Sequence, residues 1–402
     1  MPDTETQHDP IEIFVDALII GGGVAALWTA NALRAKGYST IVLTNSPLGE
    51  GQSLAAQGVI HGGLKYAVGG KLTDSSEALA EMPKRWLDAL AGRGEINLGK
   101  AKLLSDHQLM WSLPNVVSQV VGFFGSKAVR GRADAIPRED FPELFATGEY
   151  RGKLFRIEEP VIDPVSTIEA LAENVSGSVY QVDWDSNAQW EVEANETRSA
   201  LLTMSSGQLV RVKAEHYILA AGAGNEAILQ KIGRERPEQQ LRPLHQLIIR
   251  KDGLPDFFSV CVGNTPKPPM VTTTHRDQQG RTVWYVGGDI AEQRGVERSE
   301  NEQIAAGQEL FAKLLPWVDL EGAEWFTWRG NRAEPHTGTG DRPPGAFCEA
   351  IGNLSVAWPT KLALAPHLGD QVLAQMKVPK HPQPERLEIL SLEVGTAPWD
   401  LP

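Results

Sequence analysis

The sequence contains very little cysteine. Its 402 residues include only Cys261 and Cys348, which allow at most one disulfide and stand in no CxxC or Cys/His spacing. This usage fits a reducing compartment and predicts no metal site. We expect both side chains to act as small buried hydrophobic groups.

Long apolar runs are also missing. No stretch offers 18 consecutive apolar residues, and the longest apolar segment, from Ala17 to Leu33, is interrupted by three glycines and by polar residues. A membrane-spanning helix needs a longer and purer run. The first fifteen residues lack the basic start and apolar centre of a signal peptide. We therefore expect no transmembrane segment and a cytoplasmic location.

Positive charge is scarce as well. The chain has 38 Lys and Arg against 51 Asp and Glu, a formal net charge of −13, and no long basic run. Nucleic acid is therefore not an expected partner, because binding to phosphates needs clustered cations. Hydrophobic residues make up 42% and charged residues 22%, which is ordinary globular usage. The length predicts a folded protein of two to three domains.

The most informative local pattern lies near the N-terminus. An apolar run from Asp16 to Ile20 precedes three glycines, a helical pattern and a second β-branched run, Thr40 to Leu43. This order predicts a βαβ unit with a GxGxxA fingerprint, in which a glycine-rich turn brings a dinucleotide diphosphate onto backbone N–H groups at a helix N-terminus. The predicted cofactor-binding residues of this turn are Gly21, Gly23, Val24 and Ala25, with Ala26 as the last fingerprint position.

The fingerprint lacks its usual acidic partner. About twenty residues on, where Asp or Glu would accept from a ribose hydroxyl, the chain has Thr44 and Asn45. These neutral residues are therefore the expected ribose contacts. No arginine stands there, so the pattern disfavours NADP.

Further along, capping and turn signals predict the coarse structure. Ser75 to Leu90 reads as a helix that Pro83 should bend, and Val378 onward reads as an extended tail on the surface. The remaining predictions are a helix from an Asp163–Pro164 start to Leu171, a capping box of Ser299 and Glu302 before a helix from Gln303 to Leu315, and hairpins formed by 200–204 with 209–212 and by 271–275 with 282–286.

The segment from Gly51 to Tyr66 is more specific than the fingerprint. It resembles the flavin-contacting loop of the FAD-dependent D-amino-acid oxidase superfamily. The string IHGGLKY looks most like glycerol-3-phosphate dehydrogenases, and QGVIHGG is similar to L-2-hydroxyglutarate oxidases. Other segments resemble the superfamily in the same order: 159–164, 219–224, 332–335, 341–343 and 352–356.

The resemblance implies an α/β fold in which a Rossmann-like FAD-binding domain is interleaved with a substrate domain of mainly antiparallel β-sheet plus helices. The expected FAD-binding domain comprises residues 14–75, 155–230 and 325–377. The substrate domain comprises 76–154 and 231–324, and 378–402 form an extended tail. The implied chemistry is hydride transfer from a small, anionic hydroxy or amino compound to flavin N5, with electrons passed on to oxygen, quinone or a soluble carrier.

The resemblance also implies site residues. Arg332 matches an arginine that holds a substrate carboxylate, with an ion pair to Glu334 or another acid as the alternative. His61 is the expected base for a hydroxyl proton, or else only packs near the flavin. The further implied cofactor contacts are Gln52, Ser53, Gln57, Gly58, Ala221, Gly222, Thr360, Lys361 and Leu362.

One segment departs from the superfamily. Its glycine-rich GHGG-like turn is replaced here by Trp358-Pro359-Thr360-Lys361-Leu362. Lys361 is the expected cation beside the reduced flavin, with an exposed lysine on a surface helix as the alternative reading. Two other functions stay open from the residues alone: an NAD-dependent dehydrogenase of simple Rossmann type, and a non-catalytic flavin-binding protein.

Overall fold

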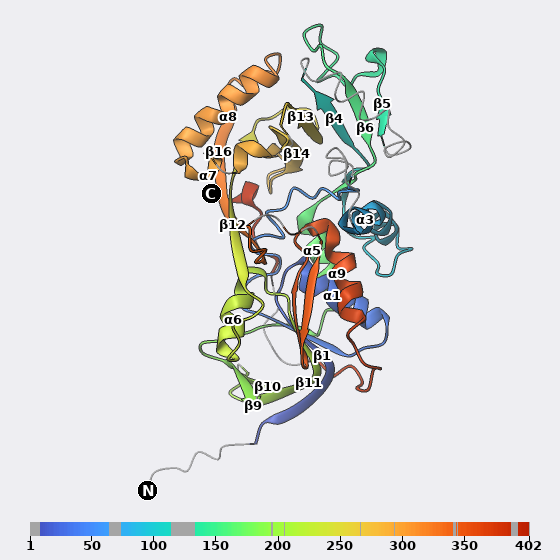
Figure 1. Cartoon of the computed structure of the whole chain (residues 1–402), viewed down its shortest axis with the longest axis vertical. Helices are drawn as coiled ribbons and strands as arrows, with labels where there is room; N and C mark the ends of the chain where they lie inside the picture. The colour runs from blue at the N-terminus through green and yellow to red at the C-terminus, as the bar shows by residue number, and fades with distance from the viewer. Residues whose placement is uncertain are drawn as a thin grey trace.

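The chain forms two large β-sheets that lie toward opposite ends of an elongated molecule (Figure 1). Two long paired strands, β12 (Gln239–Arg250) and β16 (Glu324–Pro335), belong to the second sheet and extend toward the first. The computed structural model describes residues 9–63, 74–113, 133–193, 196–204, 206–265, 267–292, 294–340, 343, 345–386 and 393–401.

The first sheet has a parallel centre. Its strands run in the order β17-β18-β11-β1-β2-β8, with β10 and β9 added antiparallel beside β11. Only the edge pair β17 and β18 is antiparallel along the main path. The strands are β1 (Ile11–Ile20), β2 (Thr40–Thr44), β8 (Val179–Gln181), β9 (Ala188–Glu193), β10 (Glu196–Thr203), β11 (Leu209–Leu219), β17 (Phe347–Ile351) and β18 (Leu354–Trp358).

The predicted βαβ unit is confirmed. Strand β1 leads into helix α1 (Val24–Ala35), and β2 returns parallel to β1. Because side chains alternate along a strand, Ala17 and Ile19 pack with the helices on one face, whereas Leu18 and Ile20 pack into the cluster on the other. Strand β2 and the second half of β1, residues 15–20, are thus covered on both faces, as parallel sheets require.

Helices cover one face of the first sheet. Helix α1 packs between α5 and α9, and the opposite face carries α6 together with the β9–β10 ribbon. A short strand pair, β3 (Leu103–Ser105) with β7 (Val161–Ile162), stands apart from both large sheets. The helices of this region are α3 (Asp74–Leu90), α5 (Pro164–Asn174), α6 (Asn225–Lys231) and α9 (Ala365–Leu373), with the 3₁₀ turns η3 (Gly222–Gly224) and η5 (Leu362–Leu364).

The second sheet is mainly antiparallel, in the order β16-β12-β15-β14-β13-β4-β6-β5. Helix α8 (Glu300–Leu314) covers one face, where Leu247 and Trp284 pack with Phe311. The fold class expected from the sequence is confirmed. The other elements are β4 (Gln108–Ser112), β5 (Ala133–Ala135), β6 (Leu154–Ile157), β13 (Ser259–Val262), β14 (Val271–Arg276), β15 (Thr282–Gly287), α7 (Arg294–Glu297), and the turns η2 (Arg138–Asp140) and η4 (Asp289–Ala291).

The local capping signals are confirmed. Asp163 caps α5 by accepting from the backbone N–H of Ser166 at 2.9 Å. Ser299 and Glu302 form a reciprocal capping box, so α8 begins at Glu300, three residues before the predicted start. Both predicted hairpins are present as β10–β11 and β14–β15, and Pro83 lies inside α3.

The domain boundaries stay a prediction. The expected boundary at residue 325 falls at the start of strand β16, which belongs to the second sheet. Residues 325–335 were assigned to the FAD-binding domain, whereas β16 pairs with β12 from Glu324 to Pro335. Twelve consecutive residue pairs hold this strand in the antiparallel sheet. The strand nevertheless contacts η3 and β18 of the first sheet at its far end.

The C-terminal segment differs from the predicted surface tail. Val394 bridges to Leu48, and Trp399, 1% exposed, stacks on His275 with ring centroids 3.9 Å apart. The turn around it is η6 (Pro398–Asp400), and Arg250 donates to the Trp399 carbonyl at 2.7 Å. The chain end thus connects the segment after β2 to the second sheet, because a large apolar ring gains more by burial than by lying on the surface.

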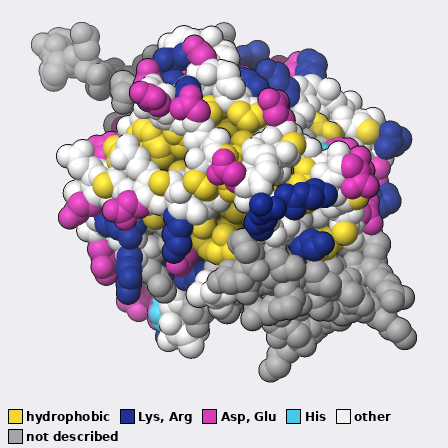
Figure 2. Space-filling view, turned by 90° about the horizontal axis from the view of Figure 1, so that it is seen from above, with side chains coloured by type: hydrophobic (Ala, Val, Ile, Leu, Met, Phe, Trp, Pro, Cys, Tyr) yellow, Lys and Arg dark blue, Asp and Glu magenta, His cyan; other side chains and the backbone are white. Residues whose placement is uncertain are grey.

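Both cysteines are free, as small apolar side chains would be; Cys261 is buried and Cys348 is half-buried. In the part of the chain that the structure describes, no helix is long and apolar enough to cross a membrane. Seen from the end that carries the second sheet, apolar side chains lie among lysines, arginines and acids (Figure 2).

Replacing Trp399 with alanine should destabilise the protein by about 3 kcal/mol or more, because it leaves a cavity beside His275 and Tyr285. Urea unfolding followed by circular dichroism measures the change. The matched control is Leu401→Ala, which removes a side chain that is 41% exposed and should stay within about 0.5 kcal/mol. Equal losses for the two variants would contradict the anchoring role of Trp399.

Candidate active site

The first glycine turn lies where three strands of the first sheet end. Gly21 has φ +130°, and a side chain there would overlap the carbonyl oxygen of Ala220 at the end of β11. A side chain on Gly22 would lie 2.7 Å from the Thr44 hydroxyl oxygen at the end of β2. Only glycine permits this approach, so the turn is pressed against the carboxyl edge where α/β sheets bind ligands.

The N-terminus of α1 begins at this turn. Gly23 is the N-cap and supplies no side-chain cap. The Val24 backbone N–H donates to the Ser53 hydroxyl at 3.0 Å, which brings the loop after β2 onto the helix start. Positive potential at a helix N-terminus favours a diphosphate, and Val24 and Ala25 occupy the first turn where the sequence predicts contact. The residues present therefore fit the diphosphate of a dinucleotide cofactor.

The two predicted ribose contacts differ in exposure. Thr44 is 2% exposed, and its hydroxyl donates to the Ser46 carbonyl at 3.1 Å. Asn45 is exposed next to it. The Thr44 hydroxyl already donates its hydrogen within the turn and is buried, so the geometry favours Asn45 over Thr44 as the ribose partner.

The second glycine turn is fixed by a residue that the sequence analysis missed. Buried Asn225 accepts from the Ala221 N–H at 2.8 Å and donates to the Ala357 carbonyl at 3.1 Å. Gly222 has φ +57°, and Gln52 reaches within 3.6 Å of where its side chain would begin. The structure thus brings Gln52, Ala221 and Gly222 together beside the first turn. Asn225 stands directly after the Gly-Ala-Gly turn at the start of a helix, and this position was the sequence signal that could have identified it.

The loop from Gly51 to Gly63 is tied to other segments on two sides. Gly58 has φ +74°, accepts from the Ile162 N–H at 2.9 Å, and has no room for a side chain against the Ile162 carbonyl. Gln57, predicted to contact the cofactor, donates both its amide hydrogens to the carbonyls of Val271 and Tyr285 in the second sheet, each at 3.0 Å. Gln57 therefore fastens the loop to the second sheet.

His61 forms a pair with a buried carboxylate. Its Nδ1 lies 3.1 Å from one oxygen of Glu159, and the Gly62 N–H donates to the other oxygen at 2.8 Å. Glu159 is 2% exposed, whereas the His61 side chain is 16% exposed. The carboxylate thus fixes the imidazole orientation and directs Nε2 away from itself. Glu159 was part of a matched segment in the sequence, but nothing in that segment indicated its partner.

The turn that replaces the glycine-rich one keeps a left-handed residue. Thr360 has φ +59°, which is costly for a β-branched side chain, and its hydroxyl donates to the Gly345 carbonyl at 2.8 Å. Lys361 and Leu362 follow, leading through η5 into α9. Lys361 is 8% exposed, so the alternative reading as an exposed surface lysine is wrong.

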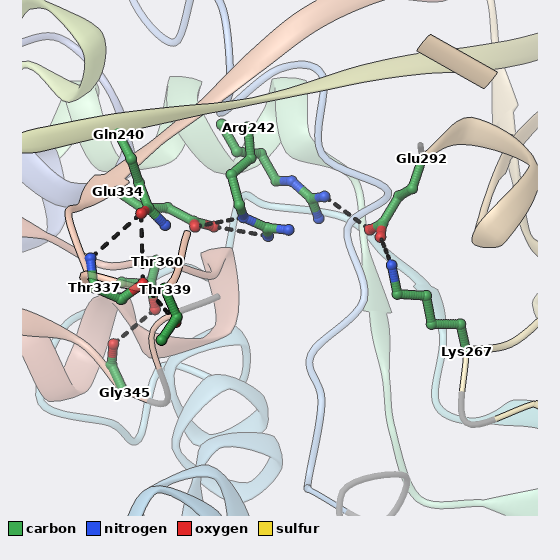
Figure 3. A network of polar contacts seen from close by, with 10 residues as sticks. Gln240, Arg242, Lys267, Glu292, Glu334, Thr337, Thr339, Gly345 and Thr360 are labelled. Carbon is green, nitrogen blue, oxygen red and sulfur yellow. Dashed lines mark hydrogen bonds and ion pairs between the residues drawn. The ribbon is translucent and has the colours of Figure 1, made fainter. Parts of the chain in front are cut away.

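Arg332 forms the ion pair that the alternative reading allowed, and its partner is an acid other than Glu334. Its guanidinium lies 2.8 Å from Glu292, while Glu334 is bound by Arg242 at 2.7 and 3.1 Å (Figure 3). Arg242 and Arg332 are direct partners in the β12–β16 register. Both arginines are an even number of residues from Ile248 and Phe326 on their strands, so their side chains point to the same face of the sheet. That face is the one away from α8. That face meets the loop after β2, because Tyr285 donates to the Ala55 carbonyl at 3.1 Å.

Electrostatics keep Glu292 ionised. Burial alone would raise its pKa, but the charges and hydrogen bonds of Arg332 and Lys267 lower it to about 2. Lys267 lies 3.1 Å from the second oxygen of this carboxylate. Glu292 therefore carries its negative charge at every pH at which the protein would work.

The structure gathers most of the predicted residues around one edge of the first sheet. The two glycine turns, Ser53, Gln52 and the turn after β18 are linked by direct contacts, since Trp358 donates to the Gly222 carbonyl at 3.1 Å. Strand β16, which carries Arg332, contacts η3. Leu64 to Tyr66, Asp341 and Arg342 lie outside the described residues. Within the described ranges, no three potential metal ligands cluster.

Comparisons with known proteins agree with this geometry. A family model described as FAD dependent oxidoreductase, DAO, matches residues 16–354. The chain is 42% identical over 369 residues, 92% of each protein, to the probable FAD-dependent oxidoreductase PA4991 of Pseudomonas aeruginosa. The crystal structure of PA4991 superposes with a TM-score of 0.83 and 36% identity, covering 97% of this chain and 99% of that one.

More distant structures share the fold. Glycine oxidase from Geobacillus kaustophilus has a TM-score of 0.65 at 14% identity, covering 94% of this chain and 100% of that chain. L-α-glycerophosphate oxidase from Mycoplasma pneumoniae, solved with FAD bound, has a TM-score of 0.64 at 14% identity, covering 94% and 99%. At this identity, the likeness concerns the fold alone.

Replacing Gly58 with alanine should lower the FAD content of the purified protein by at least tenfold, because the added methyl group overlaps the Ile162 carbonyl and displaces the loop. Flavin absorbance per polypeptide measures it. Gly280→Ala is the matched control, since Gly280 has a similar φ of +80° but open space around it. That variant bears only the backbone penalty of about 1 kcal/mol. Full FAD content in Gly58→Ala would contradict the anchoring of the loop.

Proposed function

Because this chain belongs to the DAO family of FAD-dependent oxidoreductases, we propose that it oxidises a small, anionic hydroxy or amino compound by hydride transfer to flavin N5. The cofactor is FAD and the protein is an enzyme, so the alternatives of an NAD-dependent dehydrogenase and of a non-catalytic flavin-binding protein are overturned by the family match. The substrate class rests on the arrangement of charged side chains described above.

The observation that carries the proposal is the position of Arg332. This guanidinium lies on the side of β16 turned away from α8, on a strand that contacts the second glycine turn. A planar fork suits a carboxylate or phosphate, which it can hold with two parallel hydrogen bonds. A substrate anion held there would place the rest of a small molecule near the cofactor.

The named substrates of the fold relatives agree with an anionic group. Glycine oxidase, iminodiacetate oxidase and L-proline dehydrogenase are named for amino compounds that carry a carboxylate, and the glycerophosphate oxidase for an alcohol that carries a phosphate. Their common feature is at least one anionic group in the same small molecule as an oxidisable C–H bond. We infer the same pattern for the substrate of this chain.

Other residues of the chain would bind the cofactor, stabilise the charge of the reduced flavin and accept a proton. The α1 N-terminus, Gly21 and Gly23 would hold the diphosphate, and FAD when bound would supply the hydride acceptor. Lys361, buried at the start of η5, would stabilise negative charge on the reduced flavin together with the N-terminus of the η5–α9 segment. For a hydroxy substrate, Nε2 of His61 would accept the hydroxyl proton, since Nδ1 faces Glu159. An amine that is already neutral needs no such base.

Arg332→Met should reduce kcat/KM about 10- to 100-fold, mostly through KM, because a charge-assisted hydrogen bond contributes about 1.5–3 kcal/mol. The measurement is anaerobic bleaching of the FAD spectrum by pools of hydroxy acids, amino acids and polyol phosphates. The matched control is Arg276→Met, an arginine of the same sheet that pairs with exposed Asp256. Bleaching by uncharged compounds alone, unaffected by Arg332→Met, would overturn the anionic substrate.

His61→Asn should slow flavin reduction by a hydroxy substrate about 10²- to 10⁴-fold, the usual contribution of a general base. Glu159→Gln should give a smaller loss, because it changes only the orientation of the imidazole. Anaerobic stopped-flow absorbance gives both rates, and His107→Asn, in an exposed pair with Asp106, is the control. An unchanged reduction rate in His61→Asn, with a hydroxy substrate, would contradict the assignment of His61 as the base.

A further inference from the structure

Arg242 and Arg332 are bound by carboxylates that differ in burial and in the number of hydrogen bonds. Glu334 is 1% exposed and binds Arg242 through two hydrogen bonds, so it is part of the fixed framework of β12 and β16. Glu292 is 22% exposed and meets Arg332 through a single hydrogen bond of 2.8 Å. Of the two acids, Glu292 is the one whose contact can be exchanged.

Glu292 also has a second cation within reach. In Figure 3 its carboxylate lies between Lys267 on one side and Arg242 on the other, and Lys267 is 3.1 Å from its second oxygen. The backbones that carry these two residues are fastened together, because the Asp289 N–H donates to the Pro268 carbonyl at 2.9 Å. A side chain on Gly288 would come within 2.8 Å of the same carbonyl. The backbone therefore holds Lys267 and Glu292 at a fixed distance from each other.

We propose that Glu292 is an internal competitor for Arg332, which the anionic group of the substrate displaces onto Lys267. The inference rests on the proposed function, since it assumes that Arg332 receives that group. Displacing a partly buried carboxylate normally strands a charge at high cost. Here Lys267 keeps the displaced carboxylate paired, so the exchange replaces one ion pair by another.

The charges around the exchange define which substrates fit. Arg242 is held by Glu334, whereas the Glu292 carboxylate contacts Arg332 with one oxygen and Lys267 with the other. A substrate anion therefore has to compete with Glu292 for Arg332. A planar carboxylate can take two donors of the Arg332 fork where Glu292 takes one, and a neutral compound cannot displace Glu292 at all. Glu292 thus acts as a specificity-determining residue that excludes uncharged compounds and weakens the binding of poor anions.

The test is a titration of the FAD-loaded enzyme with acetate, followed by the change in the flavin absorbance spectrum. Glu292→Gln, an isosteric change that removes the competing charge, should tighten acetate binding at least tenfold. Lys267→Met should weaken binding several-fold in the otherwise native protein, because Glu292 then has nowhere else to pair. In the Glu292→Gln background, Lys267→Met should have no effect, which separates displacement from a simple sum of charges.

The matched control is Glu324→Gln. Glu324 pairs with Arg250 at the other end of the same β12–β16 pair, so the substitution makes the same change in charge away from Arg332. Acetate affinity should then stay within twofold of the native value. Circular dichroism and FAD content verify that every variant is folded and loaded.

The outcomes separate this inference from the proposed function. Acetate binding that is lost in Arg332→Met but is not tightened by Glu292→Gln overturns the competitor role alone. An equal effect of Lys267→Met with and without Glu292 overturns it as well. If acetate fails to perturb the flavin in every variant, or binds equally well to Arg332→Met, the anionic substrate itself is overturned.

Discussion

The loop that follows β2 is the constraint on which the site depends, because it is held from both sheets at once. Gln57 donates to two carbonyls of the second sheet, whereas Gly58 and Ile60 are hydrogen-bonded to the segment 160–162 that leads into α5. Ser53 of the same loop accepts from the first N–H of α1. One stretch of backbone therefore fixes the start of α1 relative to the second sheet, and a shift of that stretch would misalign the proposed cofactor and substrate positions.

The second contribution is a set of charges placed in a partly dry environment. Arg242 and Arg332 stand opposite each other on neighbouring strands, where like charges repel, so each needs its own carboxylate. The His61–Glu159 pair supplies a further buried carboxylate. An acidic chain thus gathers cations and their counter-ions at one place, and this is the feature on which the proposed anionic substrate depends.

Sequence reasoning succeeded where the information is local. The N-cap Asp163, the capping box of Ser299 with Glu302 and the β14–β15 hairpin are set by residues within a few positions of one another, and all are confirmed. Partners far apart in sequence were missed. Glu159 is 98 residues from His61, and Glu292 is 40 residues from Arg332, so no spacing rule could pair them. Trp399 was placed on the surface because a proline-rich tail gives no sign of the pocket that receives its ring.

The sequence by itself determined the βαβ unit with its glycine turn, several caps and hairpins, and the family, because glycine conformations, caps and short motifs act over a few residues. Only the tertiary structure decided that Thr360 takes a left-handed conformation in place of glycine, that Lys361 is buried, and that Arg332 is matched by Glu292 and not by Glu334. These properties depend on burial and on the distances between charges. Both are fixed only when β12, β16 and the loop after β2 pack against one another.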